Sequence, residues 1–165
     1  MNGSKSYNRV LFMKLDNTLY DNILQQALAS PRRRMHYDLR TQALMPGQAG
    51  HDGGESVGHD EDPEWKDMSQ RMLNVLMPET VIPIHRHAET SETVIVCRGS
   101  VREEFYDDKG QKIDEVVLVA GGECPGLQVP KGMYHTCVCL EPGSVIFEAK
   151  DRPYDPMATE EFLVR

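Results

Sequence analysis

The second half of the chain is a series of short segments separated by turn residues, and this pattern limits the possible folds most strongly. β-Branched and aromatic residues recur in these segments, and Gly, Pro and Asp cluster between them, as in Asp107–Gly110 and Glu141–Gly143. Such spacing favours antiparallel strands. We expect eight strands, at residues 69–77, 80–87, 92–99, 100–108, 114–123, 126–130, 134–141 and 144–151. The sequence therefore predicts an all-β protein, a closed jelly-roll barrel or sandwich.

Other elements are expected outside this series of strands, near both ends of the chain. Residues 16–30 are expected to form a helix that Asp16 or Asn17 caps and Ser30-Pro31 ends, because apolar residues recur at helical spacing at Leu19, Ile23, Leu24, Ala27 and Leu28. Residues 32–40 are expected to form a short strand, and residues 158–162 a short helix near the chain end.

Composition divides the chain further. The 165 residues are enough for one domain with a real core. We divide them into an N-terminal extension (1–14), the helix with the first strand (15–42), a flexible acidic Gly-rich loop (43–63) and a barrel with a C-terminal tail (64–165).

Charge and composition exclude several classes of function. The formal net charge of −8 argues against nucleic acid as a main partner, because phosphate binding needs a basic surface. No apolar run is long enough for a secretory signal or a membrane span, so we expect a cytoplasmic protein without a membrane partner. The four cysteines include no CxxC pair and are expected to be reduced thiols.

Two histidines stand one residue apart in the stretch "PIHRHAETSETVIVCRG" (83–99). His85 and His87 would project from the same face of a strand, about 7 Å apart at their α-carbons. Two imidazoles at this spacing can converge on one metal ion. Glu92 begins the next expected strand, and His135 follows a Pro-Lys-Gly turn later in the chain, so both are candidates for the same site.

These residues fit two known motifs. H-x-H-x4-E-x6-G is present from His85 to Gly99, and P-x-G-x2-H is present from Pro130 to His135, and together they resemble the motifs of the cupin family. The resemblance implies a cupin double-stranded β-helix, a jelly-roll barrel, with one metal ion held by three histidines and one glutamate. Two positions depart from the pattern: Glu79 stands where the family has glycine, and Cys139 where it has asparagine.

A narrower resemblance covers most of the chain. "SPRRRMHYDL", "QRMLNVL", "PIHRH", "VPKGMYHT" and "EPGSVIFEAKDRPYDP" are similar to segments of the WbuC-type cupin-fold metalloproteins. That family implies a link to surface polysaccharide genes, and hence to sugar or nucleotide-sugar metabolism, without implying a reaction. Many cupins pair through their sheets, so we expect a homodimer by analogy.

The expected cofactor is one divalent transition metal: Fe, Mn, Ni, Co or Zn. Three functions stay open. The first is a metal-dependent enzyme acting on a small polar molecule, an isomerase or epimerase, with Glu103, Glu104 or Tyr106 as general base. The second is an Fe(II) dioxygenase. The third is a module that binds a sugar or an anion without catalysis.

Other side chains are candidates for contact with the ligand. Two roles stay open for Arg34: it is either solvated at the end of the helix or holds an anionic group through bidentate contacts. Gln70 and Asn74 are expected to face the pocket. Cys137 lies two residues from His135, either as core filling or beside the metal. A role in a lid or at the rim is expected of Lys150 and Tyr154. His36 is expected at the surface or rim, and His51 and His59 are expected to be solvated.

Overall fold

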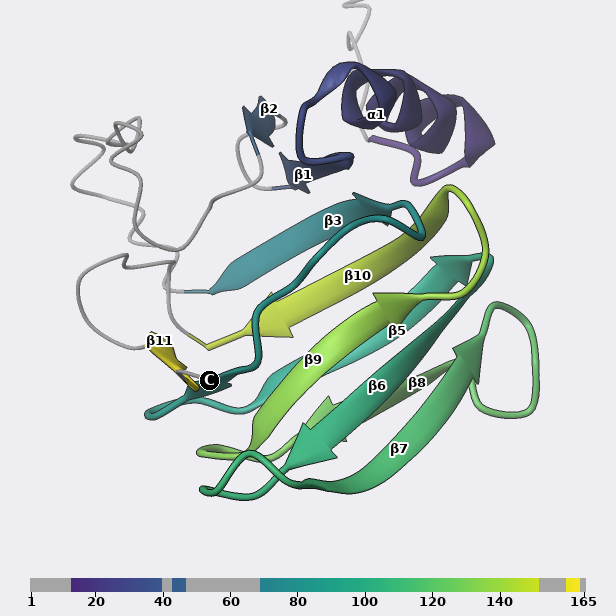
Figure 1. Cartoon of the computed structure of the whole chain (residues 1–165). Coiled ribbons are helices and arrows are strands. Elements are labelled where there is room, and N and C mark those ends of the chain that lie inside the picture. The colour runs from purple at the N-terminus through teal and green to yellow at the C-terminus, as the bar shows by residue number, and fades with distance from the viewer. Residues whose placement is uncertain (1–12, 40–42, 47–68, 152–159, 164–165) are drawn as a thin grey trace, which may run out of the picture.

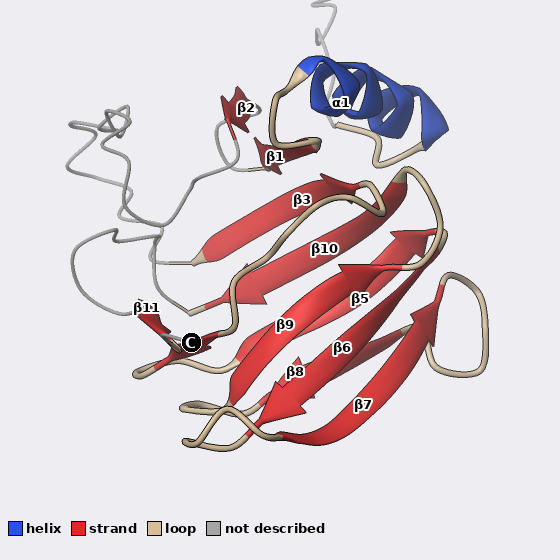
Figure 2. Cartoon of the chain, viewed as in Figure 1, coloured by secondary structure: helices blue, strands red, loops and turns tan. Residues whose placement is uncertain are grey.

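The computed structural model describes residues 13–39, 43–46, 69–151 and 160–163. In these ranges, one helix precedes eleven strands that form two antiparallel sheets (Figures 1 and 2). The predicted all-β class with an N-terminal helix is confirmed. Among these residues, the structure has no helix of the length and apolar character that crossing a membrane requires.

The two sheets face each other and enclose the interior of the barrel (Figure 1). Both join segments that lie far apart in the sequence, such as β3 with β10 and β6 with β9. The first sheet has the order β2 (Ala43–Pro46), β1 (Arg34–Asp38), β3 (Gln70–Leu76), β10 (Ser144–Lys150), β5 (Glu92–Arg98) and β8 (Gly126–Val129). The second has the order β11 (Glu160–Phe162), β4 (His85–His87), β9 (Tyr134–Cys139), β6 (Ser100–Tyr106) and β7 (Lys112–Val119).

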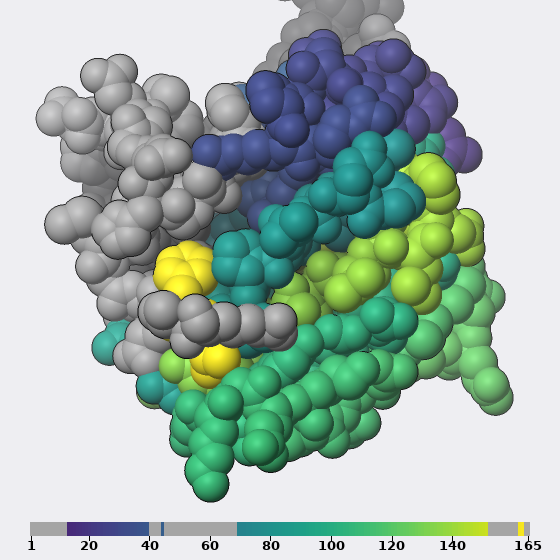
Figure 3. All heavy atoms as spheres, viewed as in Figure 1, coloured from purple at the N-terminus to yellow at the C-terminus, as the bar shows by residue number. Residues whose placement is uncertain are grey.

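Helix α1 (Asn17–Ala29) covers the outer face of the first sheet. The Asp16 side chain caps it by accepting hydrogen bonds from the backbone N–H groups of Thr18 and Leu19, as the sequence predicts. Figure 3 shows the helix, in purple, at one end of the molecule and the residues of β6 and β7, in green, at the opposite end. The packed side chains of this outer cluster are Tyr20, Ile23, Ala27, Leu73, Val75 and Val145.

The barrel interior has an apolar part that both sheets build. Its buried members are Leu76, Val94, Val96, Val101, Leu118, Val129, Cys137, Cys139 and Ile146. Gly99 carries the chain from the first sheet to the second with φ +74°, and a Cβ there would collide with the Ser144 side chain. The conformation and the close approach together explain the glycine at this position of the motif.

Three of the predicted elements need correction. The strand expected at 80–87 is limited to β4, since Pro83 has no N–H for a sheet ladder. The helix expected at 158–162 is wrong: Glu160–Phe162 form β11, which pairs with β4. The loop expected at 43–63 is wrong at its start, where Ala43–Pro46 form β2. Its remainder, with His51 and His59, lies outside the described residues, as does Tyr154.

Candidate metal centre

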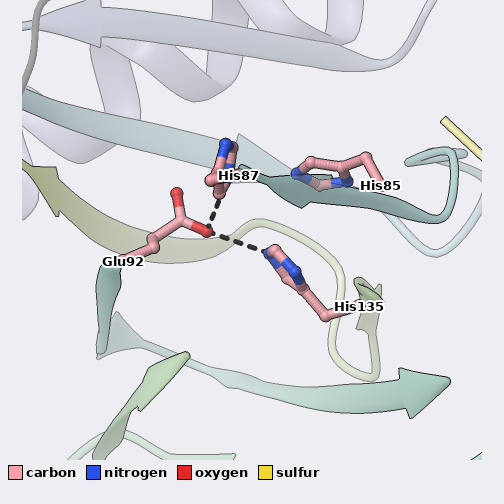
Figure 4. Close-up of side chains that lie close together, drawn as sticks. All are labelled: His85, His87, Glu92 and His135. Carbon is pink, nitrogen blue, oxygen red and sulfur yellow. Dashed lines mark hydrogen bonds and ion pairs between the residues drawn. The ribbon is translucent and has the colours of Figure 1, made fainter. Parts of the chain in front are cut away.

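Four side chains from three strands meet inside one end of the barrel (Figure 4). They come from β4, from the first residue of β5 and from β9, and the register places His85 directly beside His135. One potential ligand atom from each residue lies within 4.8 Å of all the others. The sequence spacing therefore identified a real spatial cluster, which comprises His85, His87, Glu92 and His135.

The orientation of two imidazole rings is fixed by backbone carbonyl groups. Nδ1 of His85 lies 2.9 Å from the carbonyl oxygen of Pro83, and Nδ1 of His135 lies 3.0 Å from that of Met133. A proton on Nδ1 makes each bond, which leaves the Nε2 lone pair for a metal ion. Gly132, with φ +77°, turns the chain into β9 and donates its N–H to the carbonyl of His87, so the turn is tied to β4.

Glu92 provides the negative charge of the cluster. Its Oε2 lies 3.0 Å from Nε2 of His135 and 3.4 Å from Nε2 of His87. Burial opposes ionisation, but the Lys150 ammonium and the hydrogen bonds from both histidines outweigh it and hold the pKa of Glu92 well below its usual value. The carboxylate is therefore ionised and ready to bind a cation.

The two histidines bonded through Nδ1 differ in protonation. Burial lowers the pKa of His85 to about 3, and the nearby His135 adds to this effect, so His85 is a neutral imidazole. Burial also works to lower the pKa of His135, yet the hydrogen bond and the charge of Glu92 raise it above its usual value. A metal ion would thus take the place of the His135 proton, since a histidine ligand must be deprotonated.

The donor set fits a divalent transition ion. Three imidazole nitrogens and one carboxylate oxygen suit Zn, Fe, Co, Ni and Mn, which bind such atoms at about 2.0–2.2 Å. Ligand atoms around one ion are separated by at most twice that bond length, and the separations within 4.8 Å are close to this limit. His87, Glu92 and His135 are buried and His85 is half-buried, and together they could hold one metal ion.

Glu103 is the one candidate general base that faces the interior. The register pairs it with Cys137 of β9, whereas Glu104 and Tyr106 alternate with it on strand β6 and bond to each other. Glu103 is 1% exposed. Burial raises the pKa of its carboxyl to about 8, although His135 and a hydrogen bond from Cys137 act in the opposite direction.

Glu148 is a further interior carboxyl, and the sequence analysis missed it. It accepts a hydrogen bond from the side-chain amide of Asn74. Burial and the negative charge of Glu92 raise its pKa to about 7, while Arg34 and Lys150 oppose the rise. The register places it two residues from Lys150 on the interior face of β10, between Met72 and Val94.

The other predicted side chains lie on strands around this interior. Asn74 is fully buried, Gln70 is 7% exposed, and both alternate on β3 with the residues that face the helix. The Arg34 guanidinium acts on the pKa values of Glu148 and Cys137, which places its charge beside the barrel interior. Whether these side chains contact a ligand stays a prediction.

His36 and Lys150 lie deeper than the sequence predicted. His36 is not at the surface: it is 7% exposed, and burial lowers its pKa well below the usual value, with added effects of Arg34 and Lys150. The Lys150 side chain is 8% exposed and ends at the cluster itself, with Nζ 3.3 Å from Oε1 of Glu92 and 3.3 Å from Nε2 of His87.

Comparison with known proteins supports the fold. Residues 59–118 match the family described as "Domain of unknown function (DUF6016)", a match that includes His85, His87 and Glu92 but ends before His135. No curated protein matches the sequence. The capsular polysaccharide assembling protein CapF of Staphylococcus aureus is similar in structure, with a TM-score of 0.51 and 22% identity over 59% of this chain and 27% of that chain.

Two further solved structures are similar. CapF with the inhibitor 3-isopropenyl-tropolone has a TM-score of 0.51 and 23% identity, over 59% of this chain and 28% of that chain. Oxalate decarboxylase of Bacillus subtilis has a TM-score of 0.48 and 21% identity, over 59% of this chain and 24% of that chain. This chain therefore spans about a quarter of the length of each. The fold is cupin-like, as the motifs predicted, and the narrower resemblance to WbuC-type proteins stays a prediction.

Proposed function

We propose that this protein is a metal-dependent enzyme that transfers protons on a small polar molecule bound inside the barrel. The observation that carries the proposal is the convergence of four ligand atoms, three of them on buried residues, beside the fully buried carboxyl of Glu103. A divalent ion held by His85, His87, Glu92 and His135 would supply Lewis-acid polarisation of a substrate oxygen.

Glu103 is the side chain that we assign to proton transfer. Its pKa of about 8 is close to neutral pH, where a group can both hold and release a proton, and efficient acid–base catalysis needs such a value. Its Oε2 is buried and has no hydrogen-bond partner among the described residues. A buried oxygen without a partner is costly, and a bound substrate would provide one.

Substrate contacts are proposed for the polar side chains of the neighbouring strands. Asn74 and Gln70 offer amide groups from β3, Arg34 offers a cation from β1, and Cys137 lies beside Glu103 on β9. We propose a sugar or nucleotide-sugar derivative as substrate. Two observations support this class: the resemblance to WbuC-type proteins, and the structural similarity to CapF, a capsular polysaccharide assembling protein.

The test is exchange of substrate hydrogen with solvent. Metal-loaded protein is incubated in D2O with a panel of sugars and nucleotide sugars, and proton NMR follows loss of carbon-bound hydrogen. We expect exchange in the wild type and a loss of about 100-fold or more in Glu103→Gln, since general acid–base catalysis contributes about 10²–10⁴-fold. Glu104→Gln is the matched control, because it alters the adjacent carboxyl on the opposite face of β6.

Three outcomes would contradict the proposal. Equal exchange in Glu103→Gln and the wild type would remove Glu103 from the reaction. Binding of a panel member that stabilises the metal-loaded fold, without exchange, would identify a binding module instead. Oxygen consumption by the Fe(II)-loaded protein in the presence of such a ligand would identify a dioxygenase.

A further inference from the structure

Strand β4 carries two of the four residues of the metal cluster, yet it is only three residues long. Within the described residues, its register with β9 is limited to His85 and His135, and one further backbone bond joins the N–H of Gly132 to the carbonyl of His87. Two strands paired over so short a length are only marginally stable in water. The positions of the two β4 histidines therefore depend on what else holds this strand.

Strand β11 pairs with the other side of β4 along its whole length. The register aligns Glu160–Phe162 antiparallel to His85–His87, and every residue of each strand has a partner. The N–H of Leu163 donates to the carbonyl of Ile84 at 3.0 Å, which extends the contact beyond both strands. In the sheet order β11 lies outside β4, so without it the strand that carries two ligands would be an edge strand.

Two side chains of this segment make contacts near the cluster. Phe162 is the register partner of His85, and the centroids of their rings lie 6.2 Å apart, a distance typical of aromatic pairs. On its other side, the His85 ring lies 4.5 Å from the ring of His135, measured between centroids. Leu163 packs against the turn between β6 and β7, where a Cβ added to Gly110 would lie 2.6 Å from its Cδ2. β11 thus contacts a ligand side chain as well as the backbone of β4.

The attachment of β11 is local, because neither Phe162 nor Leu163 belongs to one of the two apolar clusters of the described residues. Segments with few buried apolar contacts open at low free energy, so a modest change in their contacts shifts the balance between docked and open. A metal ion needs its ligand atoms at closely defined distances, and a loosely held ligand strand weakens binding. The same contacts therefore affect both the docking of β11 and the geometry of the metal ligands.

We infer that β11 is a coupled part of the metal centre: its docking through Phe162 and Leu163 positions His85 and His87, and a bound metal ion in turn holds β11 on β4. The inference rests on the proposed function, because it needs a metal ion at the cluster. Such coupling is reciprocal, so the factor by which docking strengthens metal binding is the factor by which the metal strengthens docking. Phe162 and Leu163 are positioning residues, since neither offers a metal ligand.

The first experiment is amide hydrogen exchange of the full chain, measured by mass spectrometry with and without Co(II). Protection of the amides of β11 should rise about tenfold or more with Co(II), because opening of this strand would then also weaken metal binding. The control is β7, the strand at the opposite end of the same sheet, and its protection should change less than about twofold. Equal exchange of β11 with and without bound Co(II) would overturn the inference.

The second experiment measures Co(II) affinity by calorimetry and Co(II) coordination by visible absorption. Leu163→Pro removes the N–H that donates to Ile84, and we expect its affinity to fall about tenfold or more. Phe162→Ala should lower the affinity by about threefold or more and alter the Co(II) spectrum, because His85 loses the ring beside it. Phe162→Tyr keeps the ring and should behave as the wild type. Val117→Ala, at an exposed apolar residue of β7, is the control.

The urea midpoint of the metal-free variants separates positioning from general stability. Because β11 lies outside both apolar clusters, the midpoints of Phe162→Ala and Leu163→Pro should match that of the wild type. Wild-type Co(II) affinity in both variants would overturn the inference and leave the proposed function intact. A fall in Co(II) affinity that only follows a fall in the midpoint would also overturn it. A wild type that binds no Co(II), Mn(II), Ni(II), Fe(II) or Zn(II) would overturn the inference and the proposed metal dependence together.

Discussion

The two faces of the first sheet differ in the side chains that they bury. On the outer face, Leu73 and Val75 of β3 pack against Tyr20, Ile23 and Ala27 in a cluster of apolar side chains. On the inner face, Asn74 of the same strand is equally buried but contacts Glu148. Alternation along β3 therefore gives one strand an apolar outer side and an inner side that combines polar Asn74 with apolar Leu76, both shielded from water.

The two faces contribute differently to the stability of the fold and to its function. Burial of apolar surface stabilises the fold, whereas burial of a carboxyl group without a full set of partners destabilises it. The inner face carries such groups at Glu103 and Glu148, whose pKa values burial raises. We infer that the helix cluster and the apolar part of the barrel offset the cost of these groups, and that the polar groups are retained for binding and proton transfer.

The largest expected effect on stability comes from the outer face. Leu73→Ala should lower the free energy of unfolding by about 2–5 kcal/mol, because it leaves a cavity beneath the helix. Urea denaturation of the metal-free protein measures the change. Metal content per folded chain should stay as in the wild type. A loss below about 1 kcal/mol would contradict the assignment of this cluster as the main apolar support of the sheet.

A substitution on the inner face should raise the free energy of unfolding instead of lowering it, by an amount that depends on pH. The Glu103 carboxyl has its pKa raised from 4.5 to about 8 in the folded chain, so above pH 4.5 the unfolded chain loses this proton while the folded chain keeps it. The folded state then binds more protons, and its stability falls as pH rises from 4.5 to about 8.

Glu103→Gln should abolish this fall in stability with rising pH, because glutamine does not ionise. In metal-free protein, the free energy of unfolding of the variant should match that of the wild type near pH 4.5 and exceed it by up to about 5 kcal/mol above pH 8. Urea denaturation across this pH range gives the comparison, with Glu104→Gln as the control on the outer side of the strand. A stability difference between Glu103→Gln and the wild type that does not vary with pH would refute a protonated interior Glu103.

A smaller effect is expected at the start of the helix. Asp16→Ala removes the side-chain oxygen that accepts from the N–H groups of Thr18 and Leu19, and should lower the free energy of unfolding by about 1 kcal/mol. Asp16→Asn is the matched variant that keeps an acceptor, and it should retain most of the stability. Thermal unfolding followed by circular dichroism measures both. Equal losses in the two variants would show that the cap acts through its charge.

The sequence was sufficient to locate the four members of the cluster. Residues two apart in a strand share a face, so the His85–His87 pair could be assigned to one side without coordinates. Glu92 and His135 followed from the two motifs. The helix was predictable for a similar reason, because its apolar residues recur at helical spacing and Asp16 precedes them.

The interior beyond the cluster was harder to predict. The face of β6 on which Glu103 lies depends on where this strand begins after Gly99. Only the pairing of β6 with β9 shows that Glu103 faces the interior. In β10, apolar Val145 and Phe147 alternate with Glu148 and Lys150, a pattern typical of a strand with one exposed face. The helix covers the side of Val145 instead, and only the tertiary structure shows Glu148 and the Lys150 side chain turned toward the barrel interior.

The chain end illustrates a second limit of sequence patterns. Residues 158–162 have the composition of a helix turn, but Glu160–Phe162 pair with β4, more than seventy residues earlier in the sequence. Pairing at such a distance depends on the folded barrel, and local propensity is a weak guide to it.

Metal content of purified protein tests the central claim most directly. The comparison uses the wild type, His87→Ala and Arg86→Ala, with plasma mass spectrometry after loading with Fe, Mn, Ni, Co or Zn. Arg86 is the adjacent residue on β4, and its side chain points away from the cluster toward Tyr134 and Asp108. We predict about one metal ion per chain in the wild type and in Arg86→Ala, and less than about a tenth of that in His87→Ala. Retention of the metal by His87→Ala, or a wild type that takes up none of these ions, would contradict the account.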